Sequence, residues 1–223
     1  MSSVVISGDT SGAITLAAPA VAGTNTLSLP AVTDTLVGLA ATQTLTNKSI
    51  AATQLTGTIA AARLPAGSVL QVVQGTTTTT TTYSSAQTWT SMSSFLSASI
   101  TPTSISSKIL IFLQLGKIHN INGVIIKLTR GGSEIFIGDA AGSRPRSTIS
   151  NVSGFNGDTN HCDGLNVSYL DSPSTTSSTT YSFDAYSEGS GTTAFNRSIT
   201  DADNNQEYSS RTASSIILME IAA

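Results

Sequence analysis

The first third of the chain contains no aromatic residue, since all aromatic residues lie from Tyr83 onward. It is also almost uncharged, and residues 1–82 hold only four charged side chains: Asp9, Asp34, Lys48 and Arg63. Such a segment is too rich in Leu, Ile and Val to stay disordered, yet too poor in bulky side chains to build a globular core. It therefore predicts thin extended structure that buries its aliphatic side chains against copies of itself.

This segment repeats at a spacing of eleven residues. Residues 16–24 (LAAPAVAGT) align with residues 27–35 (LSLPAVTDT), and each unit is a short alternating strand that a proline stops. Strands of three to five residues are not stable alone, so a repeating set must stack on its neighbours or on other chains. A disordered Thr/Ala linker is the alternative. A helix of a turn or two at 58–63 would be marginal in isolation.

Aromatic and charged residues divide the chain into an extended N-terminal arm, 1–67, and a C-terminal head, 68–223, which is long enough for a core. Short β-rich runs separated by turn-rich gaps predict an all-β head of the jelly-roll or β-sandwich type. The strongest signal is a hairpin, 123–130 and 133–137 joined by Gly131-Gly132, because both glycines accept positive φ. The remaining strands are predicted at 68–74, 108–115, 165–169, 181–185 and 215–221. The continuous apolar run at 108–115 predicts a strand buried on both faces.

Charge, cysteine content and hydropathy exclude several classes of protein. The net charge of −3 includes no basic stripe that would meet phosphates, so nucleic acid is not an expected partner. The single cysteine, Cys162, allows no intrachain disulfide. No apolar stretch approaches 18 residues, so membrane insertion is not expected. The N-terminus lacks the pattern of a signal peptide, which predicts assembly in a cytoplasm.

Several strings in the arm resemble the proximal part of bacteriophage tail fibres and related virion fibres. They are LSLP at 27–30, TDTLVG at 33–38, TLTNKSI at 44–50, and QLTGTI at 54–59 followed by RLP at 63–65. The resemblance covers about 50 residues, and the head is similar only in pattern to jelly-roll tips of such fibres. It implies a homotrimer, an N-terminal end attached to other virion proteins, and a C-terminal tip that contacts the host.

The residues expected to attach the arm to the virion and to trimerise it are its regularly spaced aliphatic side chains. They are Leu16, Leu27, Leu29, Leu36, Leu45, Ile50, Leu55 and Ile59. The expected partners are the other two chains of the trimer and a tail, baseplate or capsid protein.

Catalytic and metal-binding patterns are sparse, and we expect no enzyme, cofactor or metal. His161-Cys162-Asp163 places a nucleophile, a base and a carboxylate side by side, but triads are assembled in space, so a turn or loop is the expected structure. Copies of His119 or His161 around a trimer axis are the alternative for a metal. Asp201, Asp203 and Glu207 lie in an Asp/Asn-rich segment typical of a solvated turn, although paired carboxylates also occur in glycan-cleaving proteins.

Recognition is the remaining function, and loops on a rigid β scaffold are its usual place. The candidate loops are 139–146, 171–180, 187–192 and 200–208. The receptor-contact candidates in or beside them are Tyr186, Phe195, Asn204, Asn205, Tyr208, Arg144 and Arg146. The aromatic side chains would stack on sugar rings, and their alternative place is the core or the trimer interface. Trp89, between polar neighbours, is expected to be buried.

These observations together predict a structural virion protein, a short homotrimeric tail fibre. Its head would bind a host-surface receptor, a polysaccharide in the first instance and otherwise a protein. The alternatives are a head fibre or a capsid decoration protein and, more distantly, a polysaccharide-degrading tailspike enzyme. The sequence does not distinguish a tail position from a head position on the particle.

Overall fold

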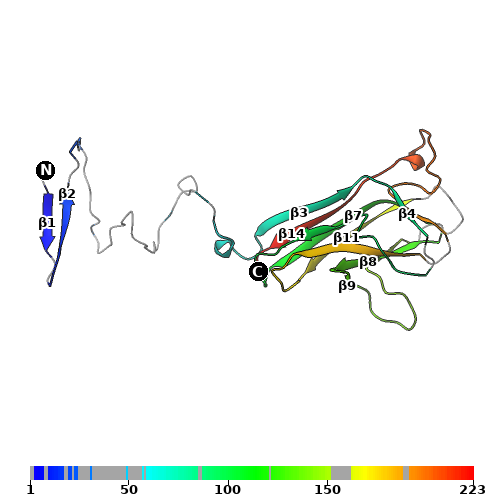
Figure 1. Cartoon of the computed structure of the whole chain (residues 1–223), viewed down its shortest axis with the longest axis horizontal. Coiled ribbons are helices and arrows are strands. Elements are labelled where there is room, and N and C mark those ends of the chain that lie inside the picture. Colours follow the sequence, from blue (N-terminus) through cyan, green and yellow to red (C-terminus); the bar gives the residue numbers. More distant parts are fainter. Residues whose placement is uncertain are drawn as a thin grey trace. The chain divides into compact units, whose positions relative to one another are not determined.

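The computed structural model describes residues 3–7, 10–17, 20–21, 23–24, 31, 49, 57, 59–84, 87–120, 122–151, 162–187 and 191–223. The chain divides into two compact units, Met1–Thr56 and Gly57–Ala223 (Figure 1). The second unit therefore includes residues 57–67, which the sequence analysis assigned to the arm. They belong to it because the backbone N–H of Gly67 donates to Ala222 O (2.7 Å) and that of Ala222 donates to Ser68 O (2.9 Å).

The described part of the first unit contains an antiparallel hairpin of β1 (Ser3–Ser7) and β2 (Ala13–Ala17), in which Val4 pairs with Leu16. The side chains of Val4, Val5 and Ile6 are all more than half exposed. The short strand expected ahead of Pro19 is confirmed as β2. Most arm candidates lie outside the described residues: Leu27, Leu29, Leu36, Leu45, Ile50 and Leu55. Ile59 is described and is 52% exposed.

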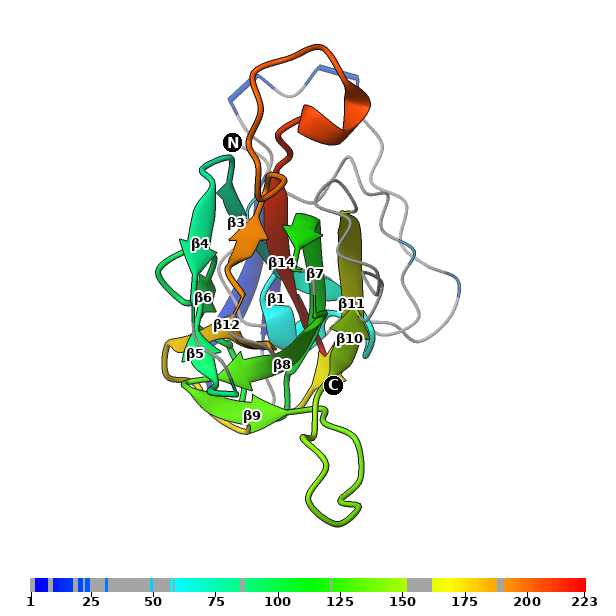
Figure 2. The ribbon, with the colours of Figure 1, turned by 90° about the vertical axis from the view of Figure 1, so that its right-hand side faces the viewer.

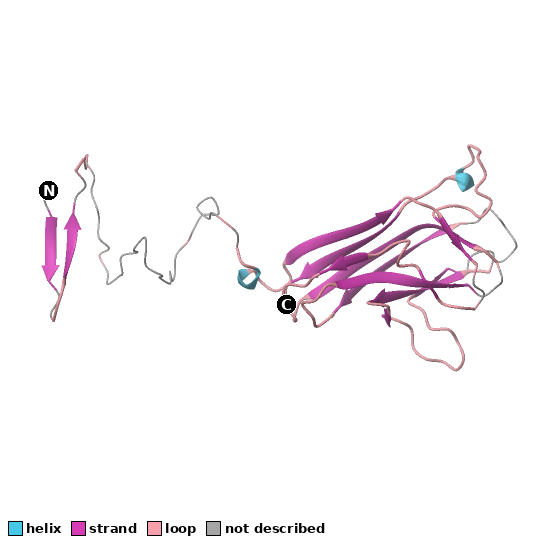
Figure 3. Cartoon of the chain, viewed as in Figure 1, coloured by secondary structure: helices cyan, strands magenta, loops and turns pink. Residues whose placement is uncertain are grey.

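The described residues of the second unit form two six-stranded sheets, in which every strand pair is antiparallel (Figures 1 and 3). The first sheet holds β3 (Val69–Thr77), β4 (Thr81–Tyr83), β7 (Lys108–His119), β11 (Asp163–Asp171), β13 (Thr193–Phe195) and β14 (Ser214–Ile221). The second sheet holds β5 (Thr90–Ser91), β6 (Ala98–Ile100), β8 (Val124–Arg130), β9 (Ser133–Ile135), β10 (Ile149–Asn151) and β12 (Thr179–Ser187). Two 3₁₀ turns, η2 (Ala61–Arg63) and η3 (Glu207–Ser209), are also described. The all-β prediction is confirmed.

One hydrophobic core lies between the inner faces of the two sheets. Alternate residues of a strand point to opposite faces, so every second aliphatic side chain enters the core. The largest fully buried side chains are Ile100, Ile109, Ile111, Leu113, Leu115, Ile118, Ile126, Leu128, Tyr181, Phe183, Phe195 and Ile216. Three of the rings form a cluster, with centroid separations of 5.8 Å between Phe183 and Phe195 and 5.5 Å between Phe95 and Phe195.

The predicted hairpin is confirmed as β8 and β9, and φ at Gly131 and Gly132 is +56° and +79°. The threonine run ends β3, crosses a short gap and forms β4. The fully buried Asn196 fixes the backbone between β3 and β4, because its Nδ2 donates to the carbonyl oxygens of Thr77 (3.3 Å) and Thr79 (2.9 Å).

Three expectations about burial were wrong. Phe195, a receptor-contact candidate, is 0% exposed within the aromatic cluster, because its strand, β13, pairs with β7 over the core. Trp89 is only partly buried, because it lies at the outer surface of a sheet. The strand at 108–115 is buried on one face only, since Phe112 on its other face is 41% exposed.

Candidate ligand-binding groove

The outer face of the second sheet carries a cluster of polar and aromatic side chains. Two rows of paired residues cross this face: Ser150, Ile125 and Tyr186 form one row, and Lys127, Asp184 and Ser91 form the next. Their side chains point outward because the residues between them on β8 and β12, such as Ile126 and Ala185, are fully buried. The alternation of these strands therefore presents the cluster to solvent.

Trp89 and Tyr186 form an aromatic platform at this surface. Trp89 directly precedes β5, and its ring centroid is 5.2 Å from that of Tyr186, with an interplanar angle of 41°. The ammonium group of Lys127 lies 4.1 Å from the centroid of the Trp89 ring and 2.6 Å from Glu134 Oε2. The ammonium group contacts the indole face on one side and the Glu134 carboxylate on the other, so its position is restrained. Its attraction to the indole face in turn holds the Trp89 ring in place.

The pKa values of two carboxylates in the cluster are shifted in opposite directions from their ordinary values. The hydrogen bond from Lys127 lowers the pKa of Glu134 below its ordinary value, with further attraction from Lys127 and Arg146. Burial raises the pKa of Asp184, although Lys127 and a hydrogen bond from Ser91 partly offset it. Asp184 is therefore the carboxylate of this surface that takes up a proton more readily as the pH falls.

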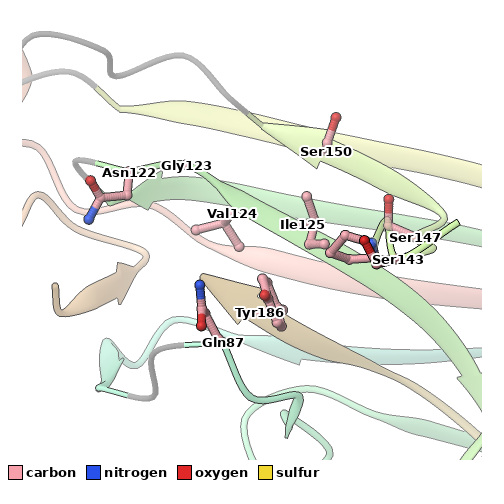
Figure 4. A pocket seen from close by; sticks show the side chains of 10 residues that line it. Gln87, Asn122, Gly123, Val124, Ile125, Ser143, Ser147, Ser150 and Tyr186 are labelled. Carbon is pink, nitrogen blue, oxygen red and sulfur yellow. The ribbon is translucent and has the colours of Figure 1, made fainter. Parts of the chain in front are cut away.

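A groove of about 600 Å³ runs beside Tyr186 (Figure 4). Asn122 lies near one end and Ser143 and Ser147 near the other, and the side chains of Gln87 and Tyr186 lie together along one side. The remaining lining residues are Gly123, Val124, Ile125, Pro145 and Ser150. Amide and hydroxyl groups thus surround a small apolar floor, which is a common composition of sites for polar organic ligands.

The loop between β9 and β10 supplies Ser143, Pro145 and Ser147 to the groove. Its base is closed by a backbone hydrogen bond from Gly138 N to Ser147 O (3.0 Å), and Arg146 Nε donates to Gly138 O (2.7 Å). Arg144 and Arg146 are exposed on this loop. The structure therefore brings the loop that carries both arginines to the same groove as Tyr186.

The other receptor-contact candidates lie elsewhere. Asn204, Asn205 and Tyr208 belong to the loop between β13 and β14, where the ammonium group of Lys117 donates to Tyr208 O (3.1 Å). This loop and the loop after β9 lie on opposite sides of the second unit (Figure 2). The predicted set is therefore divided between two separate surfaces and, for Phe195, the core, and the groove lies at the surface that carries Tyr186.

Trp89, Lys127, Gln87 and Ser150 were missed as site residues. Trp89 is the only tryptophan of the chain and has polar neighbours, which was a signal for a surface position. Lys127 interrupts the aliphatic run at 124–128, which was a signal for an outward position on β8. Gln87 and Ser150 carried no signal of their own. Strand pairing through Ile125 brings Ser150 to Tyr186, and a backbone hydrogen bond from Gln87 N to Ser187 O (2.9 Å) places Gln87 there.

Among the remaining chemical candidates, Asp201 has a structural role. Asp201 accepts from Arg211 Nε (3.0 Å) and Nη2 (2.6 Å), and this hydrogen bonding lowers its pKa. Asp163 begins β11, Cys162 precedes it, and His161 lies outside the described residues. Among the described side chains, no group of three or more His, Cys, Asp or Glu is placed to hold a metal ion. Within the same residues, no helix has the length and apolar character needed to cross a membrane.

Comparisons with known proteins assign neither a family nor a function to this chain. No protein-family model matches the chain, and no curated protein matches it at a significant level. The structure itself shows an all-β protein with a polar groove beside an aromatic platform.

Proposed function

We propose that the chain is a short homotrimeric tail fibre of a bacteriophage, whose second unit is a jelly-roll-like tip that binds a host-surface polysaccharide in the groove beside Tyr186. The N-terminal arm attaches the trimer to another virion protein. The strings in the arm support the virion setting. The groove supports recognition as the task of the second unit.

The observation that carries the proposal is the Trp89–Tyr186 platform beside a groove of amides and hydroxyls. A sugar ring has an apolar C–H face, which packs on an aromatic ring, and an edge of hydroxyls that need hydrogen-bond partners. The platform supplies the aromatic surface for the C–H face. The side chains of Gln87, Asn122 and Ser150 supply hydrogen-bond partners for the hydroxyls. The platform is restrained by Lys127 before any ligand binds, which lowers the entropy that binding would cost.

The place of the groove in the second unit also fits a binding tip. Lys108 at the start of β7 pairs with Ile221, next to the contact between Ala222 and Ser68, the residue before β3. β7 runs from there to the opposite end, and a short connection leads to Val124 at the start of β8, which lines the groove. The groove is therefore at the end of the two sheets that is remote from Ser68.

The test is binding of the full chain to an array of bacterial capsular and O-antigen polysaccharides. We expect Tyr186→Ala to weaken binding about tenfold or more, because it removes a central aromatic contact. Tyr208→Ala is the matched control, since it removes the same ring from the other loop, and it should bind as the wild type does. Circular dichroism of each variant would check that it is folded.

Three results would contradict this function. Wild-type chain that binds neither polysaccharide nor host cells would favour the head-fibre or decoration alternative, in which the unit only adds surface. Equal loss of binding in Tyr186→Ala and Tyr208→Ala would contradict the groove as the site. Release of oligosaccharide from a bound polysaccharide would favour the tailspike alternative.

A further inference from the structure

The loop between β9 and β10 leaves and returns at the same edge of β8. β9 pairs with β8 through Ile135 and Leu128, and β10 pairs with the next stretch of β8 through Ile149 and Ile126. The residues between these pairs, 136–148, project from the second unit beyond β9 (Figure 1) and form one end of the groove. The position of the loop therefore depends on how the chain is fixed at its exit from β9 and at its return to β10.

The return of the loop is fixed by Thr148. Its backbone N–H donates to Ile126 O (2.7 Å), and its Oγ1 accepts from Leu128 N (2.9 Å). The same hydroxyl donates to Ile135 O (3.4 Å), the last residue of β9. Hydrogen bonds within the second sheet therefore hold this end of the loop.

The exit of the loop is at Phe136, the first residue after β9. Its φ is +51°, in the left-handed region that bulky side chains rarely adopt. In an extended strand its ring would follow Glu134 to the outer face of the second sheet, because alternate residues share a face. Instead, the ring stacks on Tyr169 of β11, in the first sheet, with a centroid separation of 4.5 Å and an interplanar angle of 12°. The strained backbone therefore turns the ring toward the opposite sheet.

Tyr169 gives this ring a firm support. It packs against the hydrophobic core, and Val167 and Asp171, which share its face of β11, are buried. Phe136 itself is 51% exposed. A residue in a strained conformation relaxes to the extended region unless a contact holds it. The stack on Tyr169 is that contact for Phe136.

We infer that the Phe136–Tyr169 stack positions the loop between β9 and β10 and thereby sets the width of the groove. Phe136 is a positioning residue, because its ring does not line the groove. The loop that it begins supplies Ser143, Pro145 and Ser147 to the lining. The consequence for ligand binding rests on the proposed function, whereas the placement of the loop does not.

A change at Phe136 reaches the lining residues because the loop is closed on itself. Gly138 N donates to Ser147 O (3.0 Å), and Arg146 Nε donates to Gly138 O (2.7 Å), two residues after Phe136. Ser143 and Ser147 lie near one end of the groove (Figure 4). Without the ring contact, the backbone at Phe136 relaxes and displaces this closed loop from the groove.

The first test is limited trypsin digestion of the full chain, which follows cleavage after the exposed Arg146 by mass spectrometry. Phe136→Ala removes the ring, and we expect cleavage at Arg146 to be about tenfold faster, since proteolysis follows the population of the opened loop. Phe112→Ala is the matched control, because it removes a ring that is 41% exposed on the first sheet. It should be cleaved at the wild-type rate. An unchanged rate in Phe136→Ala would overturn the inference.

A double-mutant cycle tests whether the stack is the cause. Tyr169→Ala and the double variant should accelerate cleavage at Arg146 by the same factor as Phe136→Ala, because each removes the same contact. Phe136→Tyr keeps a ring and should restore the wild-type rate. A general loss of folding would also accelerate cleavage after Lys108 and Arg130, which lie in β7 and β8. Additive effects of the two alanine changes would contradict the stack as the anchor.

The second test measures binding of a polysaccharide that the wild type binds. Phe136→Ala should bind it about fivefold more weakly or worse, because an unfixed loop must be ordered on binding. Phe112→Ala and Phe136→Tyr should bind as the wild type does. Wild-type affinity in Phe136→Ala would overturn the role of the stack at the groove, even if cleavage is faster. If the wild type binds no polysaccharide, the proposed function fails, and the cleavage rates still decide the placement of the loop.

Discussion

The ammonium group of Lys127 lies 4.1 Å from the centroid of the Trp89 ring, over the face of the only tryptophan in the chain. Lys127 is on β8, and Trp89 precedes β5 on the far side of β12, so the contact spans three strands of the sheet. The cation and the indole ring lie beside the groove, and the neighbouring Tyr186 ring lines it. The fluorescence of Trp89 therefore reports directly on the candidate site.

Lys127→Met should change the environment of Trp89 without unfolding the protein. Methionine keeps the packing of the aliphatic stem but removes the cation, so the loss of stability should be no more than about 1 kcal/mol. The tryptophan emission maximum should shift, and polysaccharide binding should weaken. Fluorescence spectra and urea unfolding of both proteins would measure this. An unchanged emission spectrum would show that the cation does not contact the ring in solution.

Arg130→Ala should destabilise the protein, because it leaves Asp171 buried without its cation. Arg130 Nη1 lies 2.9 Å from both Asp171 oxygens, and Tyr181 Oη donates to Oδ2 (2.7 Å). We expect a loss of about 2–3 kcal/mol, below the roughly 3–5 kcal/mol of a fully buried pair, because a third of the Arg130 side chain is exposed.

Urea unfolding at pH 7 measures this loss, with Arg211→Ala as the matched control. Arg211 also pairs with an aspartate, Asp201, but at an exposed site, so its removal should leave the stability unchanged. Equal stability of the two variants would contradict a buried role for the Asp171 ion pair.

Glu220→Gln should lower the stability at neutral pH and have no effect in acid. Glu220 is 0% exposed and accepts from Gln71 Nε2 (2.6 Å), Thr103 N (2.6 Å) and Thr103 Oγ1 (2.7 Å). Burial alone would raise the pKa of Glu220, but these hydrogen bonds outweigh it and hold the pKa below the ordinary value of 4.5.

A lowered pKa in the folded state means that the carboxylate stabilises the protein above pH 4.5 and that this contribution is lost as the pH falls through the folded-state pKa. The wild type should therefore be more stable than Glu220→Gln by about 1–3 kcal/mol at pH 7. The difference should shrink below pH 4.5. Urea unfolding at several pH values would test this, and a difference that grows in acid would refute it.

Gly75→Ala should destabilise β3, because a Cβ atom there would overlap the carbonyl oxygen of Ser97. A backbone atom cannot move aside cheaply, so the cost should be about 1–3 kcal/mol. Gly138→Ala is the control, since the nearest atom to its Cβ is Ser147 O at 3.7 Å. Thermal or urea unfolding of the two variants compares them. A neutral Gly75→Ala would mean that the segment at Ser97 is not packed against β3.

Local patterns predicted the strands well, because alternation and turn chemistry depend on neighbours in the sequence. Gly131-Gly132 between two β-rich runs indicated the β8–β9 hairpin directly. The run at 108–115 correctly indicated β7, but a continuous apolar run did not reveal that one face of the strand, with Phe112, is exposed. The tail-fibre setting, the trimer and the arm contacts stay predictions.

The candidate site was harder to predict, because its residues come from distant parts of the chain. Tyr186 and Phe195 looked alike in the sequence, as aromatic residues beside polar loops. The structure separates them: Tyr186 points outward from β12, while Phe195 packs on Phe183 in the core. Which face of a strand is covered depends on the sheet that packs against it, and no short window of sequence contains that information.

By itself, the amino-acid sequence determined the β class, the hairpin and the contrast between an arm without aromatic residues and a second unit that holds all of them. These follow from side-chain periodicity, from turn residues and from the volume a core needs, which are local or compositional properties. Only the tertiary structure decided that Trp89, Lys127 and Tyr186 come together beside one groove and that Phe112 and Leu170 lie on the exposed face of their sheet. Both depend on the register between strands far apart in sequence, and register is set by the packing of the whole unit.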